Sequence, residues 1–582
     1  MSIIKPILLL LAATLILASC TNGSKKPESA DLVILCTTDV HGACLPYDFK
    51  RGCEAEVSLA NVSQYVKQER KADPEKVMLF DTGDFLQGQP SIYYYNYVDT
   101  TSQHLMARIF NYLGYNAIGV GNHDIETGEG IYNGRFPKMI DMPWLCANAI
   151  DTRTGQPMFQ PYAVMNRKGI KIAVLGMITP NIHAWQPKSL WPNLEFEDMV
   201  ECAQKWMPVI QEREHPDIVI GMFHAGSDYE TNGNTADTRF NENGSIPAAQ
   251  KVPGFDIIII GHDHYKALSD IVNVAGDTVK MIDAATAARF IGRADIHLQR
   301  KSDGTYSKTI KTQLVDSRQF APDADFCAEF EGDIKKVNDY FEEPLGTLTA
   351  DLNGIDGLYG PCKFMDLVHD AQLWATKADV SMAAVLSPYE EIPAGKITWR
   401  QLFVIYKYEN QLFTLLMKGK EIQKYLEFGF SNQFATMRNA NDPLINRNSN
   451  GKPVTHTFNY TSAAGIRYIV DISKPAGKRV TILSMSDGSA FDPDKDYKVA
   501  INSYQASGGG NFITEGLGWD TATLEAHTID TTPIDVRRYI AAYIKEQGTI
   551  TPHLRGDWQV IPKDLWEIGK AREIANDDRY FR

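Results

Sequence analysis

The sequence lacks the features of a zinc-thiolate protein and of a protein that binds nucleic-acid polymers. No Cys-x-x-Cys pair occurs among its eight cysteines, so a zinc site built from thiolates is not expected. The chain has 58 Lys and Arg against 72 Asp and Glu, a formal net charge of -14. Non-specific binding to a nucleic-acid backbone needs clustered Lys and Arg, which this balance disfavours. Small phosphates remain possible ligands, because bound metal ions can reverse the local field.

The sequence also lacks internal repeats, low-complexity tracts and any apolar run of transmembrane length. Its most apolar run, Ile7 to Leu17 after Lys5, is too short to span a bilayer and is typical of a signal peptide. The run closes with Leu17-Ala18-Ser19-Cys20, which resembles the lipobox of bacterial lipoproteins, where Cys20 would be lipidated. An ordinary signal peptide that ends beside a cysteine is the alternative. We expect residues 1–20 to be a lipoprotein signal peptide and residues 21–30 a tether.

Length and cysteine count limit the architecture. A chain of 582 residues is too long for one core and predicts at least two domains. Seven cysteines remain after Cys20, and an odd number in an exported chain leaves at least one free thiol. Cys44 and Cys53 share one loop and could pair. Cys36 and Cys146 lie in apolar runs and are expected in the core.

Short apolar runs alternate with polar, helix-like segments through the first half of the chain. Runs of this kind predict strands covered on both faces, and therefore an α/β domain, over residues 31–321. Residues 322–342 place apolar side chains three and four apart, which predicts a linker helix. Residues 343–582 mix helix and strand signals and form a second unit. The runs begin at Leu32, Val77, Ala117, Ile172, Ile218 and Ile257.

Five short polar motifs follow five of these runs. The carboxyl ends of parallel strands meet at one edge of a sheet, so the motifs should point into one crevice. Their carboxylate, imidazole and amide groups suit a pair of divalent ions. Two such ions about 3.5–4 Å apart can clamp a phosphoryl group and generate hydroxide near neutral pH. The motifs are Asp39-Val40-His41-Gly42, Gly83-Asp84, Gly121-Asn122-His123-Asp124, Phe223-His224-Ala225-Gly226 and Gly261-His262-Asp263-His264.

The order of these motifs resembles that of the calcineurin-like metallophosphoesterases. From Asp31 to about Asp520 the chain resembles the family of 5′-nucleotidases and 2′,3′-cyclic-nucleotide phosphodiesterases, which adds a C-terminal nucleotide-binding domain. The resemblance implies a four-layered metallophosphoesterase sandwich and a second α/β (α+β) substrate domain. It implies two divalent ions of the Zn, Mn, Co or Mg class. By motif, Asp39, His41 and His264 would hold one ion, Asn122, His224 and His262 the other, and Asp84 would bridge them.

The resemblance also assigns a catalytic histidine. His123 would be protonated and stabilise charge on the phosphoryl group. Family members related to 5′-nucleotidases often read N-H-E-F-D, where the acid orients the histidine. Glu126 takes the place of that acid here, one methylene longer. Asp81 shares the turn of Asp84, and the family pattern favours Asp84 as the bridge.

Two stretches of the second domain resemble the family's base-binding segments. Tyr504, followed by Gly508 and Gly509, matches the aromatic that stacks on the base, and the glycines allow close backbone approach. For the opposing aromatic the pattern favours Tyr460 over Phe458. For Tyr504 and for the opposing aromatic, packing in the core is the alternative to base stacking.

One departure bears on the substrate. The 5′-nucleotidase branch holds substrate with an arginine that is missing from residues 385–389. Together with Tyr406-Lys407-Tyr408-Glu409-Asn410, this is more like the 2′,3′-cyclic phosphodiesterase and 3′-nucleotidase branch. A cyclic diester carries less charge than a 5′-monoester and needs an arginine clamp less.

We therefore expect an extracytoplasmic enzyme that acts on small nucleotides, attached through its lipid alone to the periplasmic face or cell surface of a bacterial membrane. A 5′-nucleotidase or nucleotide-sugar diphosphatase is the alternative within the same class. A nucleotide-binding lipoprotein with a dead catalytic centre is the alternative from another class. The sequence does not predict which divalent metal binds, which base is preferred or which oligomeric state the protein has.

Overall fold

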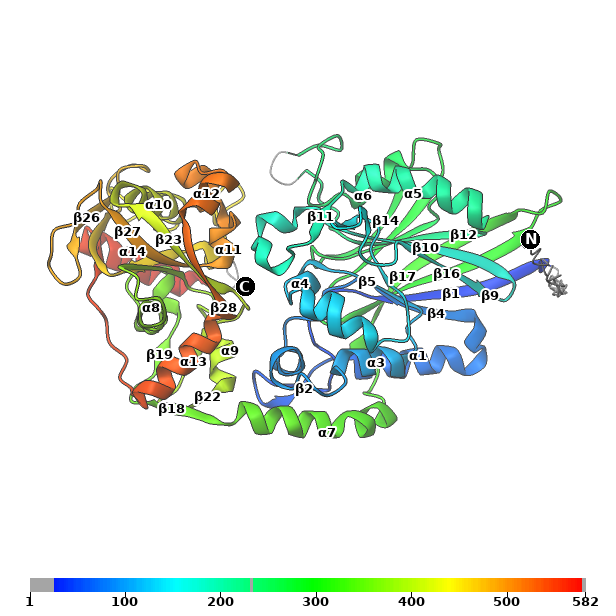
Figure 1. The fold of residues 1–582 in the computed structure, drawn as a ribbon, viewed down its shortest axis with the longest axis horizontal. Coiled ribbons are helices and arrows are strands. Elements are labelled where there is room, and N and C mark those ends of the chain that lie inside the picture. Colours follow the sequence, from blue (N-terminus) through cyan, green and yellow to red (C-terminus); the bar gives the residue numbers. More distant parts are fainter. Residues whose placement is uncertain (1–25, 231–233, 578–582) are drawn as a thin grey trace, which may run out of the picture.

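The computed structural model describes residues 26–230 and 234–577, which form two lobes joined by one long helix (Figure 1). The predicted signal peptide, with Cys20 and the first part of the tether, lies outside the described residues. Among the residues that the structure describes, none of the helices combines the length and the apolar composition of a membrane span.

The first lobe is built on two six-stranded sheets. Across the first sheet lie β17 (Tyr306–Asp316), β16 (Phe290–Arg300), β1 (Ser29–Thr37), β4 (Val77–Asp81), β5 (Ala117–Gly119) and β6 (Trp144–Leu145). Across the second lie β14 (Lys266–Val272), β15 (Thr278–Ala284), β13 (Ile257–Ile260), β12 (Ile218–His224), β10 (Ile170–Ile178) and β9 (Tyr162–Arg167). In each sheet four neighbouring strands pair in parallel, β1-β4-β5-β6 and β10-β12-β13-β15. The parallel strands therefore end at one edge of each sheet.

The two sheets pack face to face, with helices on their outer faces. Along β1, Leu32 and Ile34 face the second sheet, whereas Val33 and Leu35 belong to the core that contains α1 (Leu59–Ala72) and α3 (Leu105–Leu113). This division follows from the two-residue period of a strand. On the far side, α5 (Met199–Glu214) and α6 (Ser245–Lys251) cover the second sheet. The order helix, sheet, sheet, helix confirms the predicted four-layered sandwich.

A long helix, α7 (Ala324–Phe341), connects the lobes along the lower edge of the first lobe (Figure 1). Asp323 caps it, accepting from the backbone N–H of Asp325 at 3.2 Å. Phe326, Phe330, Val337 and Phe341 form its buried stripe. Arg108 forms two hydrogen bonds with Asp333, at 2.8 and 2.7 Å. The helix is therefore anchored on the first lobe.

The second lobe is a separate mixed α and β unit. Its central sheet has the order β24 (Thr461–Ala464), β20 (Val380–Ala384), β27 (Asp496–Asn502), β23 (Gln411–Lys418) and β28 (Thr528–Asp535). Helices α8 (Lys363–Thr376), α10 (Gly419–Gln433) and α13 (Val536–Gln547) pack against it. Three smaller sheets complete the lobe. One contains β26 (Val480–Met485), β25 (Ile466–Asp471) and β30 (Trp558–Ile561), next to α14 (Lys563–Asn576), and another contains β22 (Gly395–Thr398), β18 (Pro344–Leu348) and β29 (Thr549–Ile550). The third pairs β19 (Leu352–Asn353) with β21 (Glu391–Ile392).

Short elements carry much of the surface between the lobes. Tyr93 donates from its hydroxyl to Asp535 at 3.0 Å and accepts from Arg538 at 2.8 Å. Arg400 donates to the carbonyl oxygen of Phe49. These contacts link the lobes beside the strand ends. The first lobe contributes α2 (Pro90–Tyr93) and the residue after β2 (Tyr47–Asp48), and the second contributes α9 (Trp399–Ile405) and the start of α13. Other short elements are β3 (Cys53–Glu54), α11 (Ser503–Ala506) and α12 (Thr521–His527).

The cysteines of the described residues are all free thiols. Cys36 and Cys146 are fully buried, as predicted. Cys44 is buried and Cys53 is exposed, so the pair that their shared loop allows does not form in the structure.

Candidate metal centre

The five motifs converge where the strands of the first lobe end. Strand β1 starts at the outer end of this lobe and runs toward the second lobe, so the strand ends face the other lobe (Figure 1). His224 is the last residue of β12, and Asn122 and His123 begin the short helix α4 (Asn122–Ile125) just after β5. Asp39 and His262 each lie two residues beyond a strand, after β1 and β13. The predicted site is thus one edge of the sandwich.

The backbone of this edge is in an unusual conformation. Among the seven predicted ligands, Asp39, His41, Asp84, His262 and His264 have positive φ, between 45° and 85°. Residues other than glycine rarely adopt this backbone region, and those that do are often found at functional sites. The turns also bring backbone close to the ligands: a Cβ on Gly121 would lie 2.1 Å from Asp84 Oδ1 and one on Gly261 2.5 Å from Asp39 Oδ2. Glycine is required at both positions.

Asp39, His41 and His264 form the first group of donors. His264 Nε2 lies 3.4 Å from Asp39 Oδ1 and 3.1 Å from His41 Nε2. His41 Nε2 lies 4.0 Å from Asp39 Oδ1. These three ligand atoms are close enough to hold one metal ion.

Asn122, His224 and His262 form the second group. Asn122 Oδ1 lies 2.8 Å from His262 Nδ1 and 3.1 Å from His224 Nε2. His224 is fully buried and Asn122 is 6% exposed. The amide oxygen of Asn122 and the imidazoles of His224 and His262 therefore face one point.

Asp84 lies between the two groups. Its Oδ2 is 3.1 Å from His224 Nε2 in one group and 3.8 Å from His41 Nε2 in the other. Burial alone would raise the pKa of Asp84, but His224, His123 and a hydrogen bond from His224 hold the pKa well below its ordinary value. This is the position of a carboxylate that can reach two cations.

Asp81 has a different environment. Its carboxylate accepts from the hydroxyl of Thr37 at 2.6 Å and from the backbone N–H of Gly83 at 2.9 Å. Burial raises the pKa of Asp81 to about 8. Its side chain is thus used within the turn, and it does not reach the groups of ligands.

The donor set fits two divalent ions. Each group supplies oxygen and imidazole nitrogen, the ligands of Zn²⁺, Mn²⁺ and related ions. The buried carboxylates of Asp39 and Asp84 need compensating positive charge.

His123 lies beside the donors, outside both groups. Its backbone N–H donates to Asp84 Oδ1 at 2.8 Å, and its ring Nδ1 lies 2.5 Å from Glu126 Oε2. Burial alone would lower the pKa of His123, but Asp84 and Glu126 outweigh burial and raise the pKa to about 10. The ring keeps 29% of its surface exposed. His123 is thus a partly exposed ring beside the donors, with Glu126 as its hydrogen-bond partner.

Asp124 holds the turns together and was not predicted as a site residue. It is fully buried and accepts from the backbone N–H groups of Asp84 at 3.0 Å and Gly121 at 2.8 Å. It also accepts from Phe85 and Leu86, at 3.1 and 2.9 Å. One carboxylate therefore ties the Asp84 turn to the Asn122 turn. Its position directly after Asn122-His123 was the available signal.

The predicted substrate residues lie in two environments. Tyr504 is half-buried, and a Cβ on Gly509 would lie 2.5 Å from its ring, so glycine is needed there. Gly508 has a φ of 110°. Phe458 packs edge-on against Tyr504 with centroids 6.0 Å apart. Tyr460 is only 4% exposed and lies in the core near Arg447 and Glu573. The structure thus brings Phe458, and not Tyr460, into contact with Tyr504, and the identity of the opposing aromatic stays a prediction.

Tyr408 is a second aromatic, which the sequence analysis named only as part of a longer segment and not as a substrate residue. It follows α9 and is half-buried. Burial and, next, the charge of Glu126 in the first lobe raise the pKa of Tyr408. Tyr408 in turn contributes, after burial, to the raised pKa of Tyr504. Tyr408 therefore lies within electrostatic range of both Glu126 and Tyr504.

Fold and donor set together define a metallophosphoesterase, and comparison with known proteins agrees. Residues 32–266 match the model of the calcineurin-like phosphoesterase family, and residues 344–515 match that of the 5′-nucleotidase C-terminal domain. The chain belongs to the family that joins these two domains, as the sequence motifs predicted.

Similar proteins share this two-domain arrangement. The chain is 24% identical to a 2′,3′-cyclic-nucleotide 2′-phosphodiesterase/3′-nucleotidase of Yersinia enterocolitica, over 96% of this chain and 92% of that protein. It is 25% identical to the trifunctional nucleotide phosphoesterase protein YfkN of Bacillus subtilis, over 91% of this chain but only 39% of that longer protein. A putative 5′-nucleotidase of Staphylococcus aureus has the same fold, with a TM-score of 0.75 at 21% identity, covering 91% of this chain and all of the other.

Proposed function

We propose that this chain hydrolyses phosphate esters of nucleotides outside the cytoplasm, with 2′,3′-cyclic nucleotides and 3′-nucleotides as its preferred substrates. One observation carries the proposal: a two-metal donor set on one lobe faces aromatic side chains of the other. Tyr408 is within electrostatic range of Glu126 and of Tyr504. In this proposal, a nucleotide whose base stacks on Tyr504 extends its phosphate toward His123.

The residues have distinct roles in this proposal. Metals held by the two donor groups would supply Lewis-acid activation of a water and of the phosphoryl oxygen. Asp84 spans the two groups and keeps their spacing fixed. The protonated His123 donates toward the phosphoryl oxygen on which charge develops. Glu126 orients the His123 ring through Nδ1, which leaves the opposite ring edge for substrate.

The preference for cyclic nucleotides over 5′-monophosphates rests on the loop at residues 385–389, where the 5′-nucleotidase branch holds substrate with an arginine. The loop at residues 385–389 has no arginine to clamp a dianionic 5′-phosphate. The similarity to the Yersinia protein, which is named for both activities, agrees with this preference. A 5′-nucleotidase or nucleotide-sugar diphosphatase is the competing proposal, since a 5′-nucleotidase C-terminal domain is present.

A substrate panel tests this proposal. Rates with 2′,3′-cyclic nucleotides, 3′-monophosphates, 5′-monophosphates and a nucleotide sugar are measured for the wild type and for Tyr504→Ala. We expect the highest kcat/KM with the cyclic or 3′ substrates. Losing about 1–3 kcal/mol of base stacking should raise the nucleotide KM about 5- to 150-fold in the variant.

A small aryl phosphodiester is the matched control, because it has no base to stack. Its KM should be the same in both proteins. A wild-type nucleotide KM in Tyr504→Ala would refute the stacking role. Faster turnover of 5′-monophosphates than of cyclic substrates would favour the competing activity.

We also propose that a lipid on Cys20 attaches the enzyme to a membrane. The support is the Leu17-Ala18-Ser19-Cys20 sequence after an apolar run. In a bacterial host, the full chain with Cys20→Ser should leave the membrane fraction and incorporate no labelled fatty acid. Cys53→Ser, which changes an exposed cysteine, is the control and should stay attached. Membrane retention of the Cys20 variant would contradict lipid attachment at this residue.

A further inference from the structure

One metal-ligating histidine is held at both of its ring nitrogens. His262 Nδ1 lies 2.8 Å from Asn122 Oδ1, on the side of the second donor group. Its Nε2, on the opposite edge of the ring, lies 3.1 Å from Glu242 Oε1. The indole of Trp185 packs on the same ring with centroids 5.3 Å apart and an interplanar angle of 37°. Neither Glu242 nor Trp185 belongs to a motif that the sequence analysis selected.

The chemistry of this pair fixes the tautomer of His262. A carboxylate only accepts hydrogen bonds, so the ring nitrogen facing Glu242 must carry the hydrogen. In a neutral imidazole the other nitrogen then has a free lone pair. That nitrogen is Nδ1, which faces Asn122. Because Glu242 lies on the far edge of the ring, it acts on a metal ion through His262.

The loop that carries Glu242 is built to hold it in place. Asn243 accepts from the backbone N–H of Gly226 at 3.1 Å and donates to the carbonyl oxygen of Asp228 at 3.0 Å. Asn241 donates to the carbonyl oxygen of Tyr229 at 2.8 Å. Asn241 is 4% exposed and Asn243 is 6% exposed, so both amides are buried. The Glu242 side chain between them is 25% exposed. The buried amides of Asn241 and Asn243 thus flank Glu242, whose carboxylate points at His262.

We propose that Glu242 is a positioning residue for the metal centre, which holds His262 in its metal-binding tautomer and so strengthens the site of Asn122, His224 and His262. Outer partners of this kind raise ligand basicity, and their loss typically costs about 10- to 100-fold in metal affinity. The proposal rests on the metal centre of the proposed function and is independent of the substrate. It also predicts an asymmetry, because His41 and His264 do not contact Glu242.

Metal titration of the full chain, without substrate, tests this role. Co²⁺ binding to the metal-free protein is followed by its visible absorption and by metal-to-protein ratios after dialysis. In Glu242→Ala we expect one of the two Co²⁺ sites to weaken about 10- to 100-fold and the other to keep its wild-type affinity. Glu242→Gln retains an acceptor oxygen, so its loss should be smaller.

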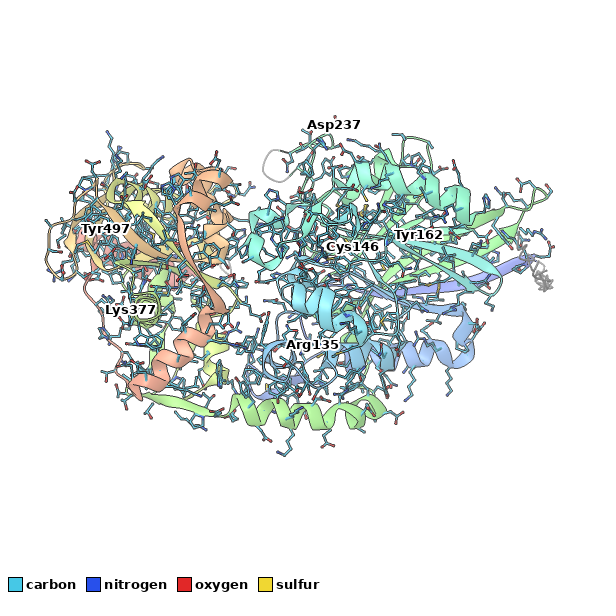
Figure 2. All side chains as sticks on the ribbon, in the orientation of Figure 1. Arg135, Cys146, Tyr162, Asp237, Lys377 and Tyr497 are labelled. Carbon is cyan, nitrogen blue, oxygen red and sulfur yellow. The ribbon has the colours of Figure 1, made fainter. Side chains whose placement is uncertain are left out.

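Asp237→Ala is the matched control from the same loop. Asp237 lies at the outer edge of the first lobe (Figure 2), where its side chain is 92% exposed and pairs with Lys251 at 2.7 Å. Both Co²⁺ sites should be unchanged in this variant. Wild-type affinities in Glu242→Ala, or an equal weakening of both sites, would overturn the proposal. If Glu242→Ala does not fold, Glu242→Gln decides: it keeps the size and the acceptor but loses the charge, so a smaller weakening of one Co²⁺ site alone supports the proposal and unchanged affinities overturn it.

The measurement separates this proposal from the substrate assignment. Metal affinity can change at one site whichever nucleotide is hydrolysed. A substrate panel that favours 5′-monophosphates would refute the proposed specificity and leave the role of Glu242 untouched. Unchanged Co²⁺ affinities would refute the role of Glu242 and leave the specificity untouched.

Discussion

Replacing Asp84 by Ala is expected to abolish phosphoesterase activity and to lower the occupancy of both metal sites together. Asp84 Oδ2 is within 3.1 Å of His224 and 3.8 Å of His41, one from each donor group. Without this carboxylate each site loses a ligand, and two cations then repel each other across an uncompensated gap. Metal-to-protein ratios and phosphate release measured on the purified variant check the prediction.

Asp81→Asn is the matched control, because Asp81 belongs to the same turn. Its carboxyl is used by Thr37 and Gly83, and burial raises its pKa to about 8, so it carries little charge at neutral pH. The variant should keep two metal ions and lose no more than about 10- to 100-fold in activity. An active Asp84→Ala protein with two ions would show that another residue bridges the metals.

The second large effect is expected at His123. His123→Gln should lower kcat about 100- to 1,000-fold, the usual cost of removing one preorganised donor to a developing oxyanion. Metal content should remain near that of the wild type, because the His123 ring lies outside both donor groups and its backbone N–H to Asp84 is kept. Single-turnover rates at saturating substrate, together with metal analysis, measure both quantities.

Glu126→Gln provides the graded comparison. It keeps a hydrogen-bond acceptor for His123 Nδ1 and removes the charge that helps to raise the pKa of His123. Its loss of kcat should therefore be smaller than that of His123→Gln. If His123→Gln retains wild-type kcat, charge at the phosphoryl group is stabilised by other residues.

The convergence of the five motifs could be predicted because each motif is local in the sequence. Each ligand comes at, or within a few residues of, the end of a strand, and parallel strands end at the same edge. The order of Asp39, Asp84, Asn122, His224 and His262 along the chain thus already places them together. The alternation that puts Ile34 and Val33 in different cores predicts strands covered on both faces, and therefore the layered fold.

What the sequence could not predict depends on contacts between distant segments. Tyr408 comes near Glu126 only because the lobes meet there, and no local pattern specifies how they meet. Phe458 and Tyr460 are two residues apart, and only packing decides which one reaches Tyr504. Glu242 lies in a polar loop, and hydrogen bonds of the buried amides of Asn241 and Asn243 fix the conformation of this loop. An acidic residue in such a loop is solvent-exposed in most sequences, so its role needs the three-dimensional structure.

The left-handed backbone at five of the ligands has a consequence for how this fold tolerates change. A residue held in that region costs about 1–3 kcal/mol, which the surrounding structure must offset. The turns that carry the predicted ligands thus lower the stability of the fold locally. The apolar layer between the two sheets must offset this cost. A substitution deep in that layer, at Ile34 or Ile220, can therefore disturb ligand geometry without touching the site. Loss of metal affinity after a distant core mutation would have its origin in the scaffold.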